Sequence, residues 1–500
     1  MLAIYIIALM LIAVWGAVFL ARGSLLAGCL VYLLTVVVFG HSFWNLRVGP
    51  APLTLDRLVL AGLVICYAFR WRLGRHEPKP LSAADWALGS FGVMLLLSTL
   101  RLEWKQGLPG GEETVMRLMI GYLMPMTIYW IARQSPLGRR EVGWVYAVLV
   151  GLGVYLGVTG LLEITGQWWA VFPRHIADPT LGIHFGRARG PMVHAVSYGL
   201  VLSVCLLAVW FLQARFGRWG KLALAATVPA MLAGLYFSYT RSVWLGTGLS
   251  LLIVFALTLR GSWRPLIVGG MVSAALMLAL FKADSILSFE REYGAQYTRK
   301  SVDLRGSFAY VSWRMFLDRP LTGFGFDQFP EAKLTYLADR STELDLDGIR
   351  PYSHHCTYLS VLTDMGLLGL ALYLAMLAGW ATAGWQLALD RQAPDWARGF
   401  AVLMLGTLGT YACQALFHEL SYTSVDHTLI FLLAGVTVGL RQKTRLESRF
   451  FQRLGQPAGQ LPAGDVPSGD ASRGNPSEDA PPAEERPAAS GTAGNSSAVS

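Results

Sequence analysis

Long apolar blocks dominate this chain and restrict what it can fold into. They run for about 17–25 residues, the length that spans a hydrocarbon core of ~30 Å as a helix. A soluble protein would interrupt such blocks with polar faces at the helical period. With 54% hydrophobic residues, 15% charged residues and a mean hydropathy of +0.45, the composition lies outside the usual soluble range. We therefore predict an all-α, polytopic membrane protein.

The apolar blocks predict about 12–13 transmembrane helices. The first two could form a short hairpin. Residues 3–20 are expected to stay as a helix, because no basic n-region or small-residue cleavage site marks a signal peptide. The predicted spans are 3–20, 25–42, 53–69, 85–100, 115–133, 142–162, 191–213, 221–238, 243–259, 264–281, 355–385, 398–417 and 426–440.

Basic residues concentrate in short loops between the blocks. If all these loops are cytoplasmic, the topology alternates without contradiction from residue 70 onward. The net charge of +9 then signals topology rather than a nucleic-acid partner. The arrangement predicts a multi-pass protein of the bacterial inner membrane with a cytoplasmic C-terminus. The basic loops are 69–80, 132–140, 213–221, 260–264 and 441–449, and the periplasmic side receives 101–114, 163–190, 238–242, 282–353 and 418–426.

Two further features bear on domain organisation. The five cysteines show no CxxC spacing, and small buried core residues are the expected interpretation. From residue 455 onward the chain consists mainly of Pro, Gly, Ala, Ser and Asp, which cannot bury enough surface to offset the entropy of ordering. We predict a membrane domain over 1–454 and a disordered cytoplasmic tail over 455–500.

The polar segment 282–353 is long enough for one large periplasmic loop with structure of its own. Within 303–320, Leu304, Phe308, Val311 and Met315 follow the helical period up to Pro320. This pattern predicts an amphipathic helix lying against the membrane surface. The Gly-punctuated stretch 321–330 predicts a turn or loop.

Several motifs are missing from the sequence. It contains no GxxxxGK[ST], no DxD pair and no HExxH, the usual signatures of ATP-driven transport, metal-dependent sugar transfer and zinc hydrolysis. Asp56, Glu163 and Asp364 lie toward span ends and do not indicate an ion-coupled transporter. His354 and His355 would point about 100° apart on a helix, with no carboxylate or cysteine cluster beside them. We expect neither a metal site nor a cofactor.

Cationic and histidine side chains gather on the predicted outer side. A single arginine at a span end is more often an anchor for lipid headgroups. His354 alone reads as a polar residue at a helix entry, and His355 could be structural or functional. Taken together, the arginines and histidines suit an anionic, lipid-linked substrate. A guanidinium group can bind two phosphate oxygens at once, and a neutral imidazole can accept a proton from a hydroxyl group. The set comprises Arg187, Arg189, His194, Arg241, Arg305, Arg314, Arg319, Arg350, His354 and His355.

Three stretches carry a family resemblance. SYTRSVWLG (238–246), WRMFLDRPLTGFGFDQF (313–329) and HCTYLSVLTDMGLLGL (355–370) resemble the O-antigen ligase and O-antigen polymerase superfamily, over roughly 185–385. GRARGPMVHAVSYG (186–199) resembles the segment that opens an earlier span of that family. Cys356 stands where the family usually has Asn after the histidine.

The resemblance implies a metal-independent, inverting, GT-C-like glycosyltransferase. It would move a glycan from undecaprenyl diphosphate to a glycan, lipid or protein acceptor at the periplasmic face, within membrane lipids and without nucleic acid. By position, His355 would be the base or orienter for the acceptor hydroxyl. Residues implied to bind the diphosphate are Arg187, Arg189, Arg241, Arg305 and Arg314, and those expected on the acceptor side are His354, Arg350 and Tyr358.

The sequence is compatible with four functions, two within the family and two outside it. Within the family, a ligase would use a lipid A-core acceptor, in lipopolysaccharide biosynthesis, and a polymerase another carrier-linked repeat unit. Outside it, a non-catalytic polysaccharide or lipid transporter could use the same arginines to bind anionic cargo. A purely structural assembly scaffold would keep its function when His355 or Arg241 is replaced by alanine.

Overall fold

The computed structural model describes residues 23–48, 51–75, 78–100, 114–281 and 295–454. The predicted span 3–20 and the predicted disordered tail 455–500 lie outside these residues. The described residues up to Ser448 form one compact unit, and the end of the last helix, from Arg449, belongs to another.

The first half of the described chain consists of helices joined by loops, together with one small hairpin. β1 and β2 pair antiparallel, with Asn45 opposite Thr54, a hairpin that the helical prediction did not include. The elements are α2 (Leu25–Leu34), a π-helix (Thr35–Phe39), α3 (Gly40–Phe43), β1 (Asn45–Val48), β2 (Ala51–Thr54), α4 (Leu55–Arg72), α5 (Ala83–Thr99), α6 (Thr114–Leu118), a π-helix (Met119–Leu123), α7 (Met124–Gln134), α8 (Arg139–Ile164) and two 3₁₀ turns (Trp168–Ala170, Arg174–Ala177).

The second half consists of helices and 3₁₀ turns joined by loops, with no strand among its described residues. Its elements are α9 (Ala195–Leu212), a 3₁₀ turn (Gln213–Arg215), α10 (Arg218–Ala225), α11 (Val228–Phe237), α12 (Arg241–Thr258), α13 (Trp263–Phe281), α15 (Ala295–Asp318), α16 (Phe329–Ala332), 3₁₀ turns (Lys333–Ala338, Asp347–Ile349), α17 (Thr357–Leu389), α18 (Asp395–Ala415), a 3₁₀ turn (Leu420–Tyr422) and α19 (Ser424–Leu454).

A helix stands at every predicted span within the described residues, which confirms the all-α prediction apart from the hairpin. Five predicted spans coincide with helices that are not among the helical segments long and apolar enough to cross a membrane: 25–42, 53–69, 85–100, 264–281 and 398–417. In the described part of the chain there are seven such segments: Thr114–Gln134, Arg139–Ile164, Ala195–Arg215, Arg218–Phe237, Arg241–Thr258, Thr357–Leu389 and Ser424–Ser448.

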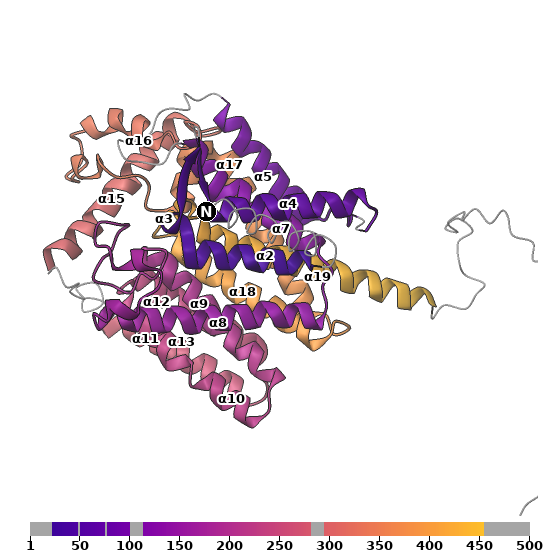
Figure 1. Cartoon of the computed structure of the whole chain (residues 1–500). Helices are drawn as coiled ribbons and strands as arrows, with labels where there is room; N and C mark the ends of the chain where they lie inside the picture. Colours follow the sequence, from indigo (N-terminus) through magenta and orange to yellow (C-terminus); the bar gives the residue numbers. More distant parts are fainter. Residues whose placement is uncertain (1–22, 49–50, 76–77, 101–113, 282–294, 455–500) are drawn as a thin grey trace, which may run out of the picture. The chain divides into compact units, whose positions relative to one another are not determined.

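Neighbouring helices are joined mainly through α9, α12, α17 and α18. α12 packs along α18, which also contacts α9 and α17, and α8 packs against α9 and α11. Figure 1 shows α8, α9 and α12 side by side. α5 packs against α17. All the Cys residues are free thiols, four of them buried and Cys356 half-buried, as expected for small core residues.

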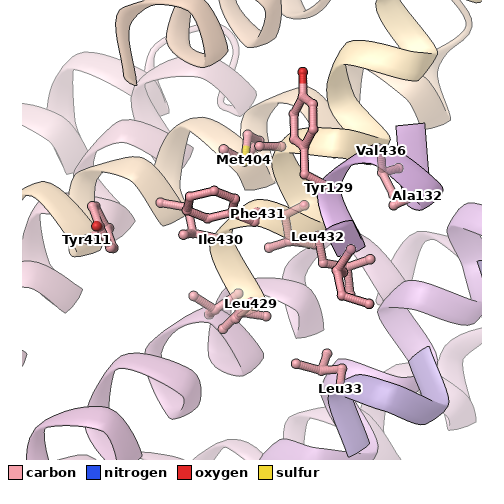
Figure 2. Close-up of a cluster of buried hydrophobic side chains, with 14 of the residues drawn as sticks. Leu33, Tyr129, Ala132, Met404, Tyr411, Leu429, Ile430, Phe431, Leu432 and Val436 are labelled. Carbon is pink, nitrogen blue, oxygen red and sulfur yellow. The ribbon is translucent and has the colours of Figure 1, made fainter. Parts of the chain in front are cut away.

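α19 carries a buried apolar surface on more than one of its sides. The consecutive residues Leu429, Ile430, Phe431 and Leu432 are all at most 1% exposed. Figure 2 shows their side chains with Leu33 of α2, Tyr129 and Ala132 of α7, and Met404 and Tyr411 of α18. Because consecutive helical residues point about 100° apart, burial of all four requires neighbours around most of the helix.

The predicted basic loops meet at one end of the helices, which we call the basic end. Lys79 donates to the carbonyls of Arg133 and Ser135 at 2.9 and 2.8 Å. Further contacts tie two more loops to this end: Arg215 to the Arg139 carbonyl, Lys443 to the Leu137 carbonyl, and Arg441 to Asp390. The charge of Arg260 acts electrostatically on Asp395, next to the same end. This grouping matches the predicted alternation, whereas the compartment that the end faces stays a prediction.

Residues 295–353, which we call the cap, have a small core of their own. Phe308, Val311 and Met315 of α15 are buried with Phe329 and other residues of the cap. The sequence predicted the helix and its apolar face, but placed that face on the membrane surface. The face is instead covered by the chain that follows α15, because residues 329–349 fold back over it.

Candidate functional site

Three segments meet where α12 and α17 begin and where α18 ends. Ser242, the second residue of α12, places its hydroxyl 2.9 Å from Nε2 of His418. The His418 carbonyl in turn accepts from the amide and the hydroxyl of Thr357, at 3.2 and 2.9 Å. Thr357 is the first residue of α17. These contacts fix the starts of two helices relative to each other, and so position the residues on either side.

Arg241, Arg305 and His355 come together around this junction, and we call them the central triad. Arg241 is the first residue of α12. Arg305 projects from α15 with its guanidinium 5.7 Å from the ring centre of Phe417, next to His418. Burial and, after it, the positive charge of Arg241 lower the pKa of Arg305. An anion bound between the two guanidinium groups would offset this repulsion.

His355 sits on the exposed side of the triad. Its ring packs edge-on against Phe308 at 4.8 Å between centroids, and it forms no hydrogen bond with any described residue. Surrounding protein atoms reduce the hydration of its charged form and, with the charges of Arg305 and Lys333, lower the pKa of His355 to about 4. The imidazole is therefore neutral near pH 7, and one of its ring nitrogens can accept a hydrogen bond from a ligand.

His354 faces the opposite way, into the protein. It is 3% exposed, its Nε2 lies 2.7 Å from the hydroxyl of Thr363 and its ring lies on Phe329. Burial, followed by the charges of Arg117, Lys333 and His355, holds the pKa of His354 well below its ordinary value. The two adjacent histidines thus occupy different environments, one internal and one accessible.

The first turns of α17 are shaped by a break at Gly366. This residue has a φ of 65°, and a Cβ there would lie 2.3 Å from the carbonyl carbon of Leu321. The break leaves the carbonyls of Thr363 and Asp364 free to accept from Phe324 and Gly325, at 2.9 and 2.8 Å. The Gly-rich loop 321–325 therefore packs into the break, which explains why both stretches are rich in glycine.

A buried arginine, Arg117 of α6, lies behind the junction. Its guanidinium donates to Asp327 at 2.6 Å and lies 3.8 Å from Asp364 and 3.6 Å from Glu419. It also stacks over Tyr422 at 4.2 Å and is 2% exposed. One side chain thus joins α6, the cap, α17 and the segment after α18.

The segment that carries Arg187 and Arg189 contacts the C-terminal end of α11, just before Arg241 in the sequence. The amide of Ala188 donates to the carbonyl of Phe237 at 3.0 Å, four residues before Arg241. Arg187 is half-buried on this segment. Arg189 is 1% exposed and its guanidinium donates to three backbone carbonyls, those of Leu181, Ile176 and Asp178.

The remaining predicted residues lie apart from the triad. Arg314 follows Arg305 by nine residues, a half-turn around α15, and is exposed on the other face near Asp339. Arg350 is exposed and paired with Asp347 at 2.9 Å. The Tyr358 hydroxyl donates to the carbonyl of Ala412 at 3.3 Å, between α17 and α18.

Sequence reasoning missed His418, Phe417 and Arg117. His418 lies in a short polar loop that carried no motif, and only its contacts with Ser242 and Thr357 reveal its position. Arg117 begins a predicted span, where an arginine usually anchors to headgroups. Its direct hydrogen-bond partners are 210 to 304 residues away, so no local pattern could have indicated them.

Comparison with known proteins gives one family match. Residues 226–374 match a family model described as O-antigen ligase. The matched region includes the central triad and the Gly366 break, and excludes Arg117 and the segment around His418. A search of curated proteins found no match.

Proposed function

Because the chain belongs to the O-antigen ligase superfamily through residues 226–374, we propose that it transfers a glycan from a polyprenyl diphosphate carrier to an acceptor hydroxyl. The carrier lipid would lie in the bilayer, and the sugar chemistry would take place at the triad, at the interface. The observation that carries the proposal is the placement of Arg305, which lies over Phe417 and interacts electrostatically with both Arg241 and His355.

Arg241 and Arg305 would bind the diphosphate of the donor. Two fixed guanidinium groups offset the negative charge that develops on the leaving diphosphate, without rearranging during the reaction. Arg187 is the residue best placed to assist, because Ala188 is bonded to the turn before Arg241. Arg189 would serve to hold its own loop, since backbone carbonyls already occupy its guanidinium.

His355 would act as the base. Its neutral imidazole takes the proton of the acceptor hydroxyl as the hydroxyl oxygen bonds to the anomeric carbon. The bond from that carbon to the diphosphate oxygen breaks, and the diphosphate leaves with the electron pair. A single displacement of this kind inverts the anomeric configuration. Binding of the anionic donor would also raise the pKa of His355 from about 4, because it offsets the charge of Arg305.

The acceptor decides between a ligase and a polymerase. We favour a ligase-type reaction onto a lipid A-core sugar, with transfer onto a second carrier-linked repeat as the alternative. The active face would be periplasmic, because the triad lies away from the basic loops, which are expected in the cytoplasm.

The test is transfer by the purified full-length protein in detergent with EDTA, from a polyprenyl diphosphate-linked glycan to a panel of acceptors. Product with a lipid A-core acceptor indicates a ligase, and elongated carrier-linked product indicates a polymerase. Carrier binding without any product would contradict the enzymatic proposal and favour a transporter. Arg340→Gln is the matched control, because Arg340 is an exposed cap residue whose ion pair with Asp347 lies outside the triad.

A further inference from the structure

A cationic cavity lies at the basic end, apart from the central triad. It has a volume of about 670 Å³ and lies between α8, α9, α18 and the turn after α12. Four of its lining residues are arginines, and the single acidic lining residue is Asp395. The arginines are Arg139, Arg215, Arg260 and Arg398. They belong to neither the central triad nor the region matched to the family, apart from Arg260.

The charges of this cavity are incompletely balanced. Asp395 pairs with Arg398, which leaves a formal excess of three positive charges on the lining. Arg139 and Arg260 are exposed, and neither forms an ion pair within 4 Å with a described residue. Arg215 donates to the Arg139 carbonyl at 2.6 Å, so its position is fixed while its charge is not neutralised. An anion at this position would relieve the repulsion among these groups.

A buried hydroxyl is the second, independent indication of a ligand. Tyr146 lines the cavity and is 2% exposed. Its hydroxyl has no hydrogen-bond partner among the described residues, although buried polar groups are nearly always bonded. Its ring is held by Phe211 and Phe400, both at 5.8 Å between centroids. The hydroxyl lies near Gly399, also in the lining, and interacts electrostatically with Arg215.

The rest of the lining is apolar and aromatic. Trp210, Trp396, Leu257 and Val402 are among its lining residues, and Trp210 is 36% exposed. Tryptophan is enriched where protein meets the membrane–water interface. Basic pockets between transmembrane helices accept phospholipid headgroups. An amphiphile could place phosphates among the arginines and acyl chains beside the tryptophans and leucine.

We propose that this cavity binds the headgroup of an anionic phospholipid, with preference for one that carries two phosphodiester groups. The three excess positive charges and the unpartnered Tyr146 hydroxyl fit such a headgroup better than a single phosphate. The bound lipid would bridge α8, α9, α12 and α18 at the end opposite the triad. The inference is independent of the glycan transfer proposed above.

The test uses the full-length protein in nanodiscs of phosphatidylcholine doped with either phosphatidylglycerol or cardiolipin. Quenching of tryptophan fluorescence by brominated forms of each lipid reports binding near Trp210 and Trp396. Wild type is expected to bind cardiolipin at least about tenfold more tightly than phosphatidylglycerol. The double variant Arg139→Gln/Arg260→Gln is expected to lose about tenfold or more of the cardiolipin affinity, and Tyr146→Phe about two- to fivefold.

The matched control is the double variant Arg218→Gln/Arg445→Gln, which makes the same charge change outside the cavity lining. Equal losses in the control and in Arg139→Gln/Arg260→Gln would overturn the proposal, because binding would then follow surface charge alone. Competition by inorganic pyrophosphate as strong as that by cardiolipin would overturn the lipid assignment and indicate a soluble anion. An unchanged unfolding temperature without lipid verifies that each variant is folded.

Discussion

The hydroxyl of Ser242 lies 2.9 Å from Nε2 of His418, across 176 residues of sequence. The carbonyl of His418 also accepts a hydrogen bond from the hydroxyl of Thr357, the first residue of α17. Arg241 and His355, which flank these two contacts, are therefore held in one place although each stands on a different segment. The proposed reaction depends on this arrangement, because a base and a diphosphate-binding arginine must act on the same sugar.

Loss of the Ser242–His418 contact should disturb positioning without removing any reacting group. Ser242→Ala is expected to lower kcat for glycan transfer by about tenfold or more, since small misplacements are costly in oriented reactions. Ser250→Ala, on the same helix but in contact with α18 at Gly406, is the control and should change kcat less. Equal effects of the two variants would argue that the contact serves only helix packing.

Arg305 should influence both donor binding and the acidity of His355. Arg305→Gln is expected to reduce kcat/KM for the donor by about 10²–10³-fold, the usual effect of removing one preorganised charge-stabilising donor. It should also raise the pKa of His355 above about 4, because the positive charge of Arg305 helps to lower it. Histidine titration by NMR measures the second effect. An unchanged His355 pKa in the variant would contradict the assigned proximity.

The pH dependence of transfer should differ between the free and the donor-bound protein. His355 must be neutral to accept a proton, so activity falls as the pH drops through its pKa. The acid limb of kcat/KM, which reports the free protein, is expected near pH 4. The acid limb of kcat should lie at higher pH, because the bound diphosphate raises the pKa. An acid limb of kcat at or below that of kcat/KM would contradict the role of His355 as a base whose pKa rises on donor binding.

The break at Gly366 should be essential to stability. Gly366→Ala places a Cβ 2.3 Å from Leu321 in a backbone conformation with φ of 65°, and is expected to cost on the order of 3 kcal/mol or to prevent folding. Gly270→Ala in α13 has no atom within 4 Å of the added Cβ, and should be neutral or stabilising by up to ~1 kcal/mol. Thermal unfolding in detergent compares the two, and similar midpoints would refute the packing argument.

Arg117 should stabilise the junction through its buried ion pairs. Arg117→Met leaves Asp327, Asp364 and Glu419 without their cation, at an expected cost of about 3–5 kcal/mol. Arg117→Met/Asp327→Leu should cost less than the sum of the single changes, because the two residues interact directly. Strict additivity in unfolding measurements would show that the pair contributes nothing.

Sequence reasoning predicted the helices well because the apolar blocks were long and clearly bounded. It also predicted Arg241, Arg305 and His355 as site candidates, and the structure places them around one junction. Helical geometry alone could have shown that Arg314 and Arg305 lie on opposite faces of the helix. Nine residues turn a helix by about 900°, which is two and a half turns. The burial of Arg189 could not be predicted in this way, because it depends on how residues 176–181 wrap around it.

The cap shows a different limit of the sequence. An amphipathic pattern predicts that one face of a helix is covered, but not by what. Here Phe308 and Met315 are covered by Phe329 and Ile349 of the same segment. The hairpin of β1 and β2 was missed because its strands are only four residues each. They lie mostly in the short stretch between two predicted spans, which we interpreted as a linker.

A single-turnover measurement with His355→Gln tests most directly whether His355 is the base. Purified wild-type protein, His355→Gln and Arg340→Gln would each be loaded with polyprenyl diphosphate-linked glycan, and then mixed with acceptor in the presence of EDTA. His355→Gln is expected to bind the donor within a few-fold of wild type but to transfer at least about 10²-fold more slowly, while Arg340→Gln is expected to match wild type. Transfer by His355→Gln at the wild-type rate would contradict the role of His355 as the base.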